Sequence, residues 1–216
     1  MVLDIKNRTE NWGTVNKLYG PIAPEVIGSV MKALGQPPGT LADIELFWRG
    51  YRDHCYDQNI TARTVNLSRL LDRFRSLFPN LRDEVKRFAD TNNGSIRLND
   101  PCNYRAEKQD GSGLFANVRN TEFDIVIETE NELFIGEVKQ TQTFGAKGTL
   151  VLPHQLLRQY VTASILLDER GVSKRIIPFI VEEEKVANKN GQVRLMEDLG
   201  YLQQGHVFQW SQLIKT

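Results

Sequence analysis

The chain is poor in cysteine. Its 216 residues contain two, Cys55 and Cys102, and these do not form a Cys-x-x-Cys pair. Two isolated thiols argue against a zinc cluster, and a disulfide framework is uncommon in a chain of this size. The sequence therefore does not belong to the classes of small protein that depend on either.

Long apolar runs are also lacking. No stretch approaches the roughly 20 apolar residues that a membrane-spanning helix requires. The first residues, MVLDIKNRTENWG, contain no apolar core of a secretory signal. We therefore expect a cytoplasmic protein that does not interact with a membrane.

The chain has no net charge, because 27 Lys and Arg residues balance 27 Asp and Glu residues. A basic total would have indicated nucleic-acid binding, but such binding requires only a local basic patch. Hydrophobic residues make up 40% and charged residues 25%, which is ordinary for a soluble globular protein. Charge alone therefore neither indicates nor excludes a nucleic-acid partner.

The pattern of apolar residues changes at about residue 95. Before that point they recur at helical spacing, which predicts helices over residues 24–34, 40–56, 66–78 and 81–90. We therefore expect a mostly helical N-terminal region over residues 1–79.

After that point strand composition dominates. Strands are predicted in LFANVR, FDIVIET, ELFIGEVKQT and RIIPFIVEEE, with a short strand and a helical turn in GHVFQWSQLIK. Residues 155–170 have helical spacing, and Pro178 suggests an edge or a bulge in its strand. This order predicts an α/β fold, a mixed β-sheet covered by helices, with the early helices on one side and the sheet core over residues 80–216. One compact domain over the whole chain is the alternative.

The segment TEFDIVIETENELFIGEVK places charged residues inside two apolar strands. If Glu130 and Asn131 form a two-residue turn, Asp124 lies opposite Glu137, with Cβ atoms about 4.5–5.5 Å apart. Lys139 lies two residues further and therefore on the same face. Phe123, Ile125, Ile127, Phe134 and Val138 are expected on the other face.

Two opposed carboxylates repel each other unless a cation lies between them. Mg²⁺ suits this arrangement, because it takes one or two carboxylates and a backbone carbonyl and keeps several waters. Lys139 could then orient a water or balance charge on a phosphate. Gly136 is expected to keep the adjoining position uncrowded. The alternative is a solvated sheet face, where acids and lysines at period two are common.

These residues resemble the core motif of the PD-(D/E)xK, or restriction-endonuclease-like, nuclease superfamily. The resemblance implies an αβββαβ core over roughly residues 80–216, Mg²⁺ (or Mn²⁺) as the cofactor and Lys139 as the water-positioning residue. Phe123 replaces the proline of the family name, and the Gln-x-x-x-Tyr signature of the exonuclease-like branch is not met. The further residues that the resemblance implies are the metal ligands Asp124, Glu137 and the Val138 carbonyl, the helix glutamine Gln155, and an additional glutamate, for which Glu84 fits better than Glu107.

Basic residues outside the motif are candidates for nucleic-acid contacts. Arg69 and Arg73 lie one helical turn apart, opposite a leucine stripe, although a solvated helix face explains them equally well. Lys147 lies in the polar loop after the motif, and Arg158 lies on the helix that follows. His54 with Cys55 and His154 are interpreted as core and helix-start residues.

The sequence thus predicts a Mg²⁺-dependent nuclease that hydrolyses phosphodiester bonds, with DNA favoured over RNA and an endonuclease favoured over an exonuclease. Cutting both strands of a duplex would require two sites, which makes a homodimer a natural corollary. Two alternatives stay open. One is a catalytically inactive module that binds nucleic acid or protein on the same fold, and the other is a small-molecule phosphoesterase.

Overall fold

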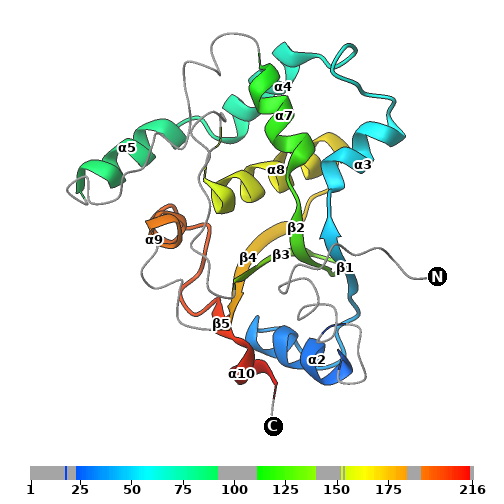
Figure 1. The fold of residues 1–216 in the computed structure, drawn as a ribbon, viewed down its shortest axis with the longest axis vertical. Helices are drawn as coiled ribbons and strands as arrows, with labels where there is room; N and C mark the ends of the chain where they lie inside the picture. The colour runs from blue at the N-terminus through cyan, green and yellow to red at the C-terminus, as the bar shows by residue number, and fades with distance from the viewer. Residues whose placement is uncertain are drawn as a thin grey trace.

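The computed structural model describes residues 18, 23–91, 111–139, 152, 154–183 and 191–214, with the side chains of 23 and 88–91 excepted. Its centre is a mixed sheet of five strands in the order β1-β2-β3-β4-β5, in which β1, β2 and β3 are antiparallel neighbours and β3, β4 and β5 are parallel ones (Figure 1). The α/β class and the mixed sheet are therefore confirmed. The strands are β1 (Asp43–Trp48), β2 (Phe123–Glu128), β3 (Glu132–Lys139), β4 (Arg175–Glu182) and β5 (Val207–Gln209).

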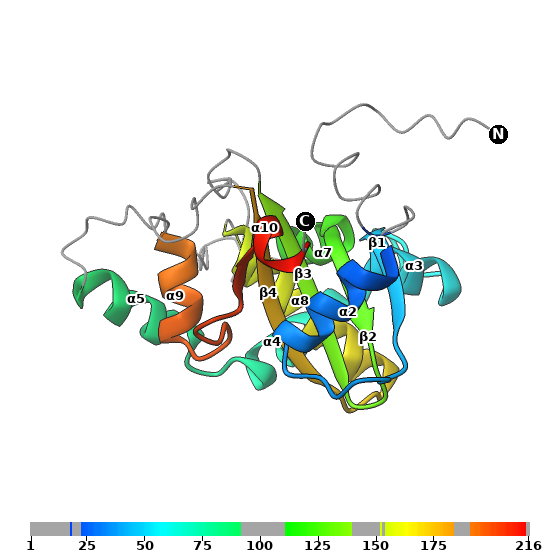
Figure 2. The same cartoon turned by 90° about the horizontal axis from the view of Figure 1, so that it is seen from below.

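Helices cover both faces of this sheet. α2 and α10 lie against one face, and α8 lies against the other with α3, α4 and α7 packed on it (Figures 1 and 2). The early helices are thus divided between the two faces, and the prediction that they cover one side is wrong. The helices are α2 (Ala23–Ala33), α3 (Gly50–Asp57), α4 (Leu67–Leu77), α5 (Leu81–Thr91), α7 (Ser112–Asn120), α8 (Gln155–Arg170), α9 (Gly191–Asp198) and α10 (Trp210–Leu213).

One strand of the sheet comes from the region predicted to be helical. Residues 43–48 form β1, which pairs with β2 along its outer edge. Ile44 and Leu46 pack against the apolar cluster on the α2 face, whereas Asp43 and Glu45 are exposed. This alternation has the period of a strand. The backbone N–H and C=O groups of residues 43–48 are bonded to the edge of β2, so they do not need the internal hydrogen bonds of a helix.

The opposite correction applies to LFANVR, which forms the middle of helix α7 and not a strand. Leu114, Phe115 and Val118 are all buried there, at a spacing that fits one face of a helix. Gly111 precedes the helix with a φ of 71°, a left-handed value that glycine adopts readily. The short apolar run was compatible with both structures, and packing against α3, α4 and α8 selects the helix.

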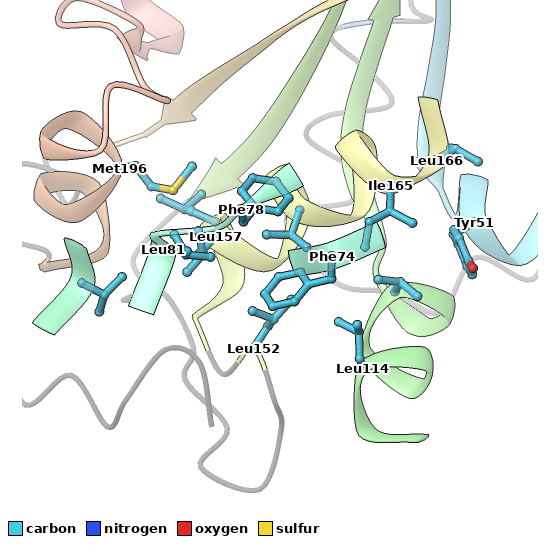
Figure 3. Close-up of a cluster of buried hydrophobic side chains, with 14 of the residues drawn as sticks. Tyr51, Phe74, Phe78, Leu81, Leu114, Leu152, Leu157, Ile165, Leu166 and Met196 are labelled. Atoms are coloured by element: carbon cyan, nitrogen blue, oxygen red, sulfur yellow. The ribbon is translucent and has the colours of Figure 1, made fainter. Parts of the chain in front are cut away.

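A large apolar cluster lies between α8 and the helices that pack on it. Figure 3 shows side chains from α3, α4, α8 and α9 gathered in this cluster, with Tyr51 at one end and Met196 at the other. Burial of each large apolar side chain contributes about 1.5–3 kcal/mol. The cluster and the β1–β2 pairing both connect the predicted N-terminal region, residues 1–79, with the predicted sheet core, residues 80–216.

β4 contains Pro178 although it lies between two strands. Its partner β5 pairs with residues 180–182, so within the described residues the side of β4 facing β5 has no strand partner at Pro178. The missing N–H therefore costs no ladder hydrogen bond, and the prediction of an edge-like position is confirmed. None of the helices in the described part of the chain combines the length and apolar composition needed to cross a bilayer.

Candidate functional site

The predicted hairpin register is confirmed. Ile125 pairs with Gly136 and Val126 with Ile135, and one residue further along the two strands lie Asp124 and Glu137. The N–H of Thr129 donates to the carbonyl of Glu132 at 2.9 Å, which closes the two-residue turn. The motif residues therefore lie together at the end of the hairpin distant from the turn.

Asp124 interacts directly with the strand that carries Glu137. Its Oδ2 accepts a hydrogen bond from the Val138 N–H at 2.9 Å. In a regular antiparallel ladder a carbonyl of the neighbouring strand would accept that bond. Because the N–H and C=O of a strand residue point to the same side, the Val138 carbonyl also faces β2, next to Asp124. The backbone group expected as a further metal ligand is thus directed toward the predicted ligand Asp124.

Glu137 is almost completely buried, with 2% of its surface exposed. Its Oε1 accepts hydrogen bonds from Lys139 Nζ and Gln155 Nε2, each at 2.5 Å. Its Oε2 accepts from Gln159 Nε2 at 2.6 Å. A carboxylate has about four lone-pair sites, so three protein donors leave it room for one more partner. These bonds compensate the cost of burying the charge.

The arrangement of β3, α8 and β4 explains why these groups meet. β3 and β4 are parallel neighbours, and α8 is the helix that connects them. A connecting helix runs back against its strands, so its first turn lies near the carboxyl end of β3. Gln155 and Gln159 are one helical turn apart and lie on one side of α8. His154 precedes them as the buried N-cap residue of α8, which confirms it as a helix-start residue.

Lys139 has a second contact in this cluster, and one further cation and one further acid border it. Lys139 is 6% exposed and donates to Gln155 Oε1 at 3.4 Å. Arg158 donates to the Leu152 carbonyl at 2.9 Å. Burial lowers the pKa of Arg158, and the negative charge of Glu137 acts in the opposite direction. Glu182, which is 2% exposed, is the register partner of Lys139 on β4.

The role expected for Gly136 is wrong. A Cβ atom at this position would lie 2.4 Å from Cζ of Phe179, its register partner on β4. Phe179 belongs to the apolar cluster on the α2 face. Gly136 therefore leaves room for an aromatic ring on the face opposite the candidate site. The face predicted for Phe123 is also wrong. Its side chain packs with Val126 and Ile135 and not with Ile125.

The other predicted site residues are not drawn into this cluster. Glu84 lies on α5, which packs against α9, and the described residues contain no group of three His, Cys, Asp or Glu side chains that could hold a metal. Arg69 is exposed on α4, whereas Arg73 forms ion pairs with Asp168 and Glu169 of α8. Glu107 and Lys147 lie outside the described residues.

Sequence reasoning missed Gln159 and Glu182. The signal for Gln159 was its position one helical turn after Gln155, which places both amides on the same side of α8. The signal for Glu182 was a carboxylate at the end of an apolar strand, but its place beside Lys139 depends on the register between β3 and β4. That register joins segments separated by a helix and could not be counted from the sequence.

The residues present suit a hard divalent cation in their chemistry. Asp124, Glu137 and the Val138 carbonyl offer oxygen ligands only, which Mg²⁺ prefers, and Mg²⁺ usually needs no more than two carboxylates. Comparison of the chain with protein-family models, with curated proteins and with solved structures finds no match. The functional argument therefore rests on the residues of the site.

Proposed function

We propose that the protein is a Mg²⁺-dependent nuclease with a restriction-endonuclease-like core, and that it hydrolyses phosphodiester bonds of nucleic acid, with DNA as the preferred substrate. The observation that carries the proposal is the convergence of Asp124, Glu137 and Lys139 at one end of the β2–β3 hairpin. Glu137 and Lys139 are buried and Asp124 is partly buried, and charged groups in such positions serve no packing purpose that apolar residues would not serve better.

Each residue has a distinct role in the proposed reaction. Asp124, Glu137 and the Val138 carbonyl would hold the Mg²⁺ ion. When bound, the ion would supply positive charge to the phosphate and a bound water of lowered pKa. Lys139, already paired with Glu137, donates hydrogen bonds to the attacking water or to a phosphate oxygen. Gln155 and Gln159 fix the Glu137 carboxylate and are positioning residues.

The test is cleavage of supercoiled plasmid and linear duplex with Mg²⁺, with Mn²⁺ and with a chelator. Lys139→Ala should abolish cutting, whereas Lys32→Ala, which removes an exposed lysine on α2, should leave it unchanged. Because Lys139→Ala leaves a buried carboxylate with one donor fewer, its fold is checked by circular dichroism. Asp124→Asn provides a second variant at a less buried position. Metal-dependent cutting that survives in both site variants would contradict the proposal.

A second candidate is a non-catalytic module on the same fold. It is favoured by the three protein donors that Glu137 has at 2% exposure, since these bonds compensate the buried charge without a metal. Calorimetric titration with Mn²⁺ separates the candidates. Binding that is lost in Asp124→Asn indicates the nuclease, and absence of binding together with a shifted nucleic-acid band in gels indicates the module.

A further inference from the structure

A second polar pocket lies at the opposite end of α8 from the candidate site. It has a volume of about 390 Å³ and is lined by α3, the segment after α3, α4 and the last turn of α8. From Gln155 to Glu169 the helix advances roughly 20 Å at 1.5 Å per residue. The pocket is therefore separate from the cluster around Glu137.

The inner wall of the pocket is a carboxylate already surrounded by donors. Glu169 Oε1 lies 2.7 Å from Arg73 Nη1, and its Oε2 lies 3.1 Å from His54 Nε2. The Tyr51 hydroxyl also donates to Glu169. Tyr51 is 1% exposed and His54 7%, so these contacts are nearly free of water. Oε1 is thus paired with Arg73, whereas the buried Oε2 lies close to His54 but forms no hydrogen bond within the described residues.

The outer part of the pocket offers donors. The Arg69 side chain is exposed, and its guanidinium makes no hydrogen bond or ion pair within the described part of the chain. The Asn66 Oδ1 accepts the Arg69 backbone N–H at 2.9 Å, which directs the Asn66 side-chain oxygen to the helix and leaves its amino group as a donor. Among the lining residues, two guanidinium groups face one carboxylate. Because Arg73 is already paired with Asp168 and Glu169, the groups that suit an anion are Arg69 and Asn66 in the outer part of the pocket.

One wall of the pocket is apolar. Ile60, Val65 and Leu70 line it, and Ile60 and Val65 are only partly buried. A volume of this size falls within the roughly 300–1,000 Å³ of small-molecule sites. An inorganic ion would leave this wall uncovered, whereas an anion with a flat organic body would cover it.

We propose that this pocket binds a nucleoside monophosphate, with the phosphate on Arg69 and Asn66 and the base against Ile60, Val65 and Leu70. A guanidinium group matches a phosphate with two parallel N–H bonds, which makes Arg69 the main anchor. The proposal does not depend on the nuclease function, because a nucleoside monophosphate contains no phosphodiester bond to hydrolyse.

The test is calorimetric titration with the four common nucleoside monophosphates, with inorganic phosphate and with adenosine. At least one nucleotide should bind more tightly than phosphate or adenosine alone. Arg69→Gln should weaken that binding about tenfold or more. The matched control is Arg63→Gln, which removes an exposed arginine from the neighbouring turn outside the pocket lining and should leave the affinity within about twofold.

The His54 ring signals in NMR spectra locate the ligand, because His54 lines the pocket. They should shift when the bound nucleotide is added, and the shift should be smaller in Arg69→Gln at the same concentration. The proposal is overturned by absence of nucleotide binding at about 1 mM, by equal affinity for inorganic phosphate, or by binding that Arg69→Gln leaves unchanged.

Discussion

The two ends of α8 each border a buried carboxylate, but the carboxylates are held in different ways. At the first turn, Glu137 is bonded by Lys139 of its own strand and by the neutral amides of Gln155 and Gln159. At the last turn, Glu169 is bonded by side chains from α3 and α4, among them the charged Arg73. The partners of Glu137 are close to it in the sequence, whereas the partners of Glu169 are far from it in the sequence.

The difference in partners gives the first and last turns of α8 different properties. At the first end, Lys139 offsets the charge of Glu137, and the neutral amides of Gln155 and Gln159 orient the carboxylate without adding positive charge. At the other end, Asp168 and Glu169 lie in the last helical turn, where the helix dipole disfavours negative charge. Arg73 binds both of them and thereby ties α4 to α8. The first end therefore contains the candidate site, and the last end ties the early helix α4 to α8.

The largest effect is expected for Glu137→Gln. The variant keeps the shape of the side chain but removes the charge that a cation requires, so cleavage of plasmid should fall about a thousandfold. Initial rates at saturating Mg²⁺ measure this, with Glu130→Gln in the exposed turn of the same hairpin as the control. Equal activity of the two variants would show that Glu137 has no role beyond structure.

Glu169→Gln should have the largest effect on stability. It leaves Arg73 with Asp168 alone and removes the charged acceptor of His54 and Tyr51, which should lower the free energy of unfolding by about 3 kcal/mol. Denaturant unfolding measures the loss, again beside Glu130→Gln. A loss no greater than that of the control would mean that the last turn of α8 does not tie the helices together.

Gly136→Ala tests packing next to the candidate site without changing any charge. The added methyl group would overlap the Phe179 ring, so we expect a loss of about 2 kcal/mol in the free energy of unfolding. Combining it with Phe179→Leu should recover part of the loss, because the flat ring is replaced by a smaller side chain. No recovery in the double variant would assign the cost to the backbone.

Alkaline pH should weaken the end of α8 that contacts α3. Burial raises the pKa of the Cys55 thiol from 9.0 to about 11. Burial, followed by the charge of Glu169, also raises the pKa of Tyr51 above its usual range. The unfolded chain therefore loses these protons at lower pH than the folded protein, and stability present below about pH 9 declines as the pH rises.

We expect a decrease of about 2 kcal/mol in the free energy of unfolding between pH 9 and about 11 from Cys55. Denaturant titrations at several pH values measure it, and Cys55→Ala should reduce the slope. Tyr51→Phe should reduce it further at the upper end of the range. An unchanged slope in both variants would show that other groups cause the decline.

Much of the candidate site could be predicted because it depends on local rules. Strand alternation and a two-residue turn are sufficient to bring Asp124, Glu137 and Lys139 together, and the register confirms that count. The helix carrying Gln155 was likewise visible from its spacing, and it ends at Gly171 in a left-handed conformation. The strand β1 and helix α7 were assigned wrongly, because short apolar runs suit either structure until a neighbour selects one.

The sequence by itself determined the α/β class, the hairpin and the placement of Glu137 and Lys139 on one of its faces, because these follow from the periods of strands and helices. Only the tertiary structure decided that β1 completes the sheet and that Glu182 lies beside Lys139. It alone also placed Tyr51, His54 and Arg69 around one pocket with Glu169. Glu169 lies about one hundred positions after the other three residues in the sequence. Its proximity to them depends on how α3, α4 and α8 pack.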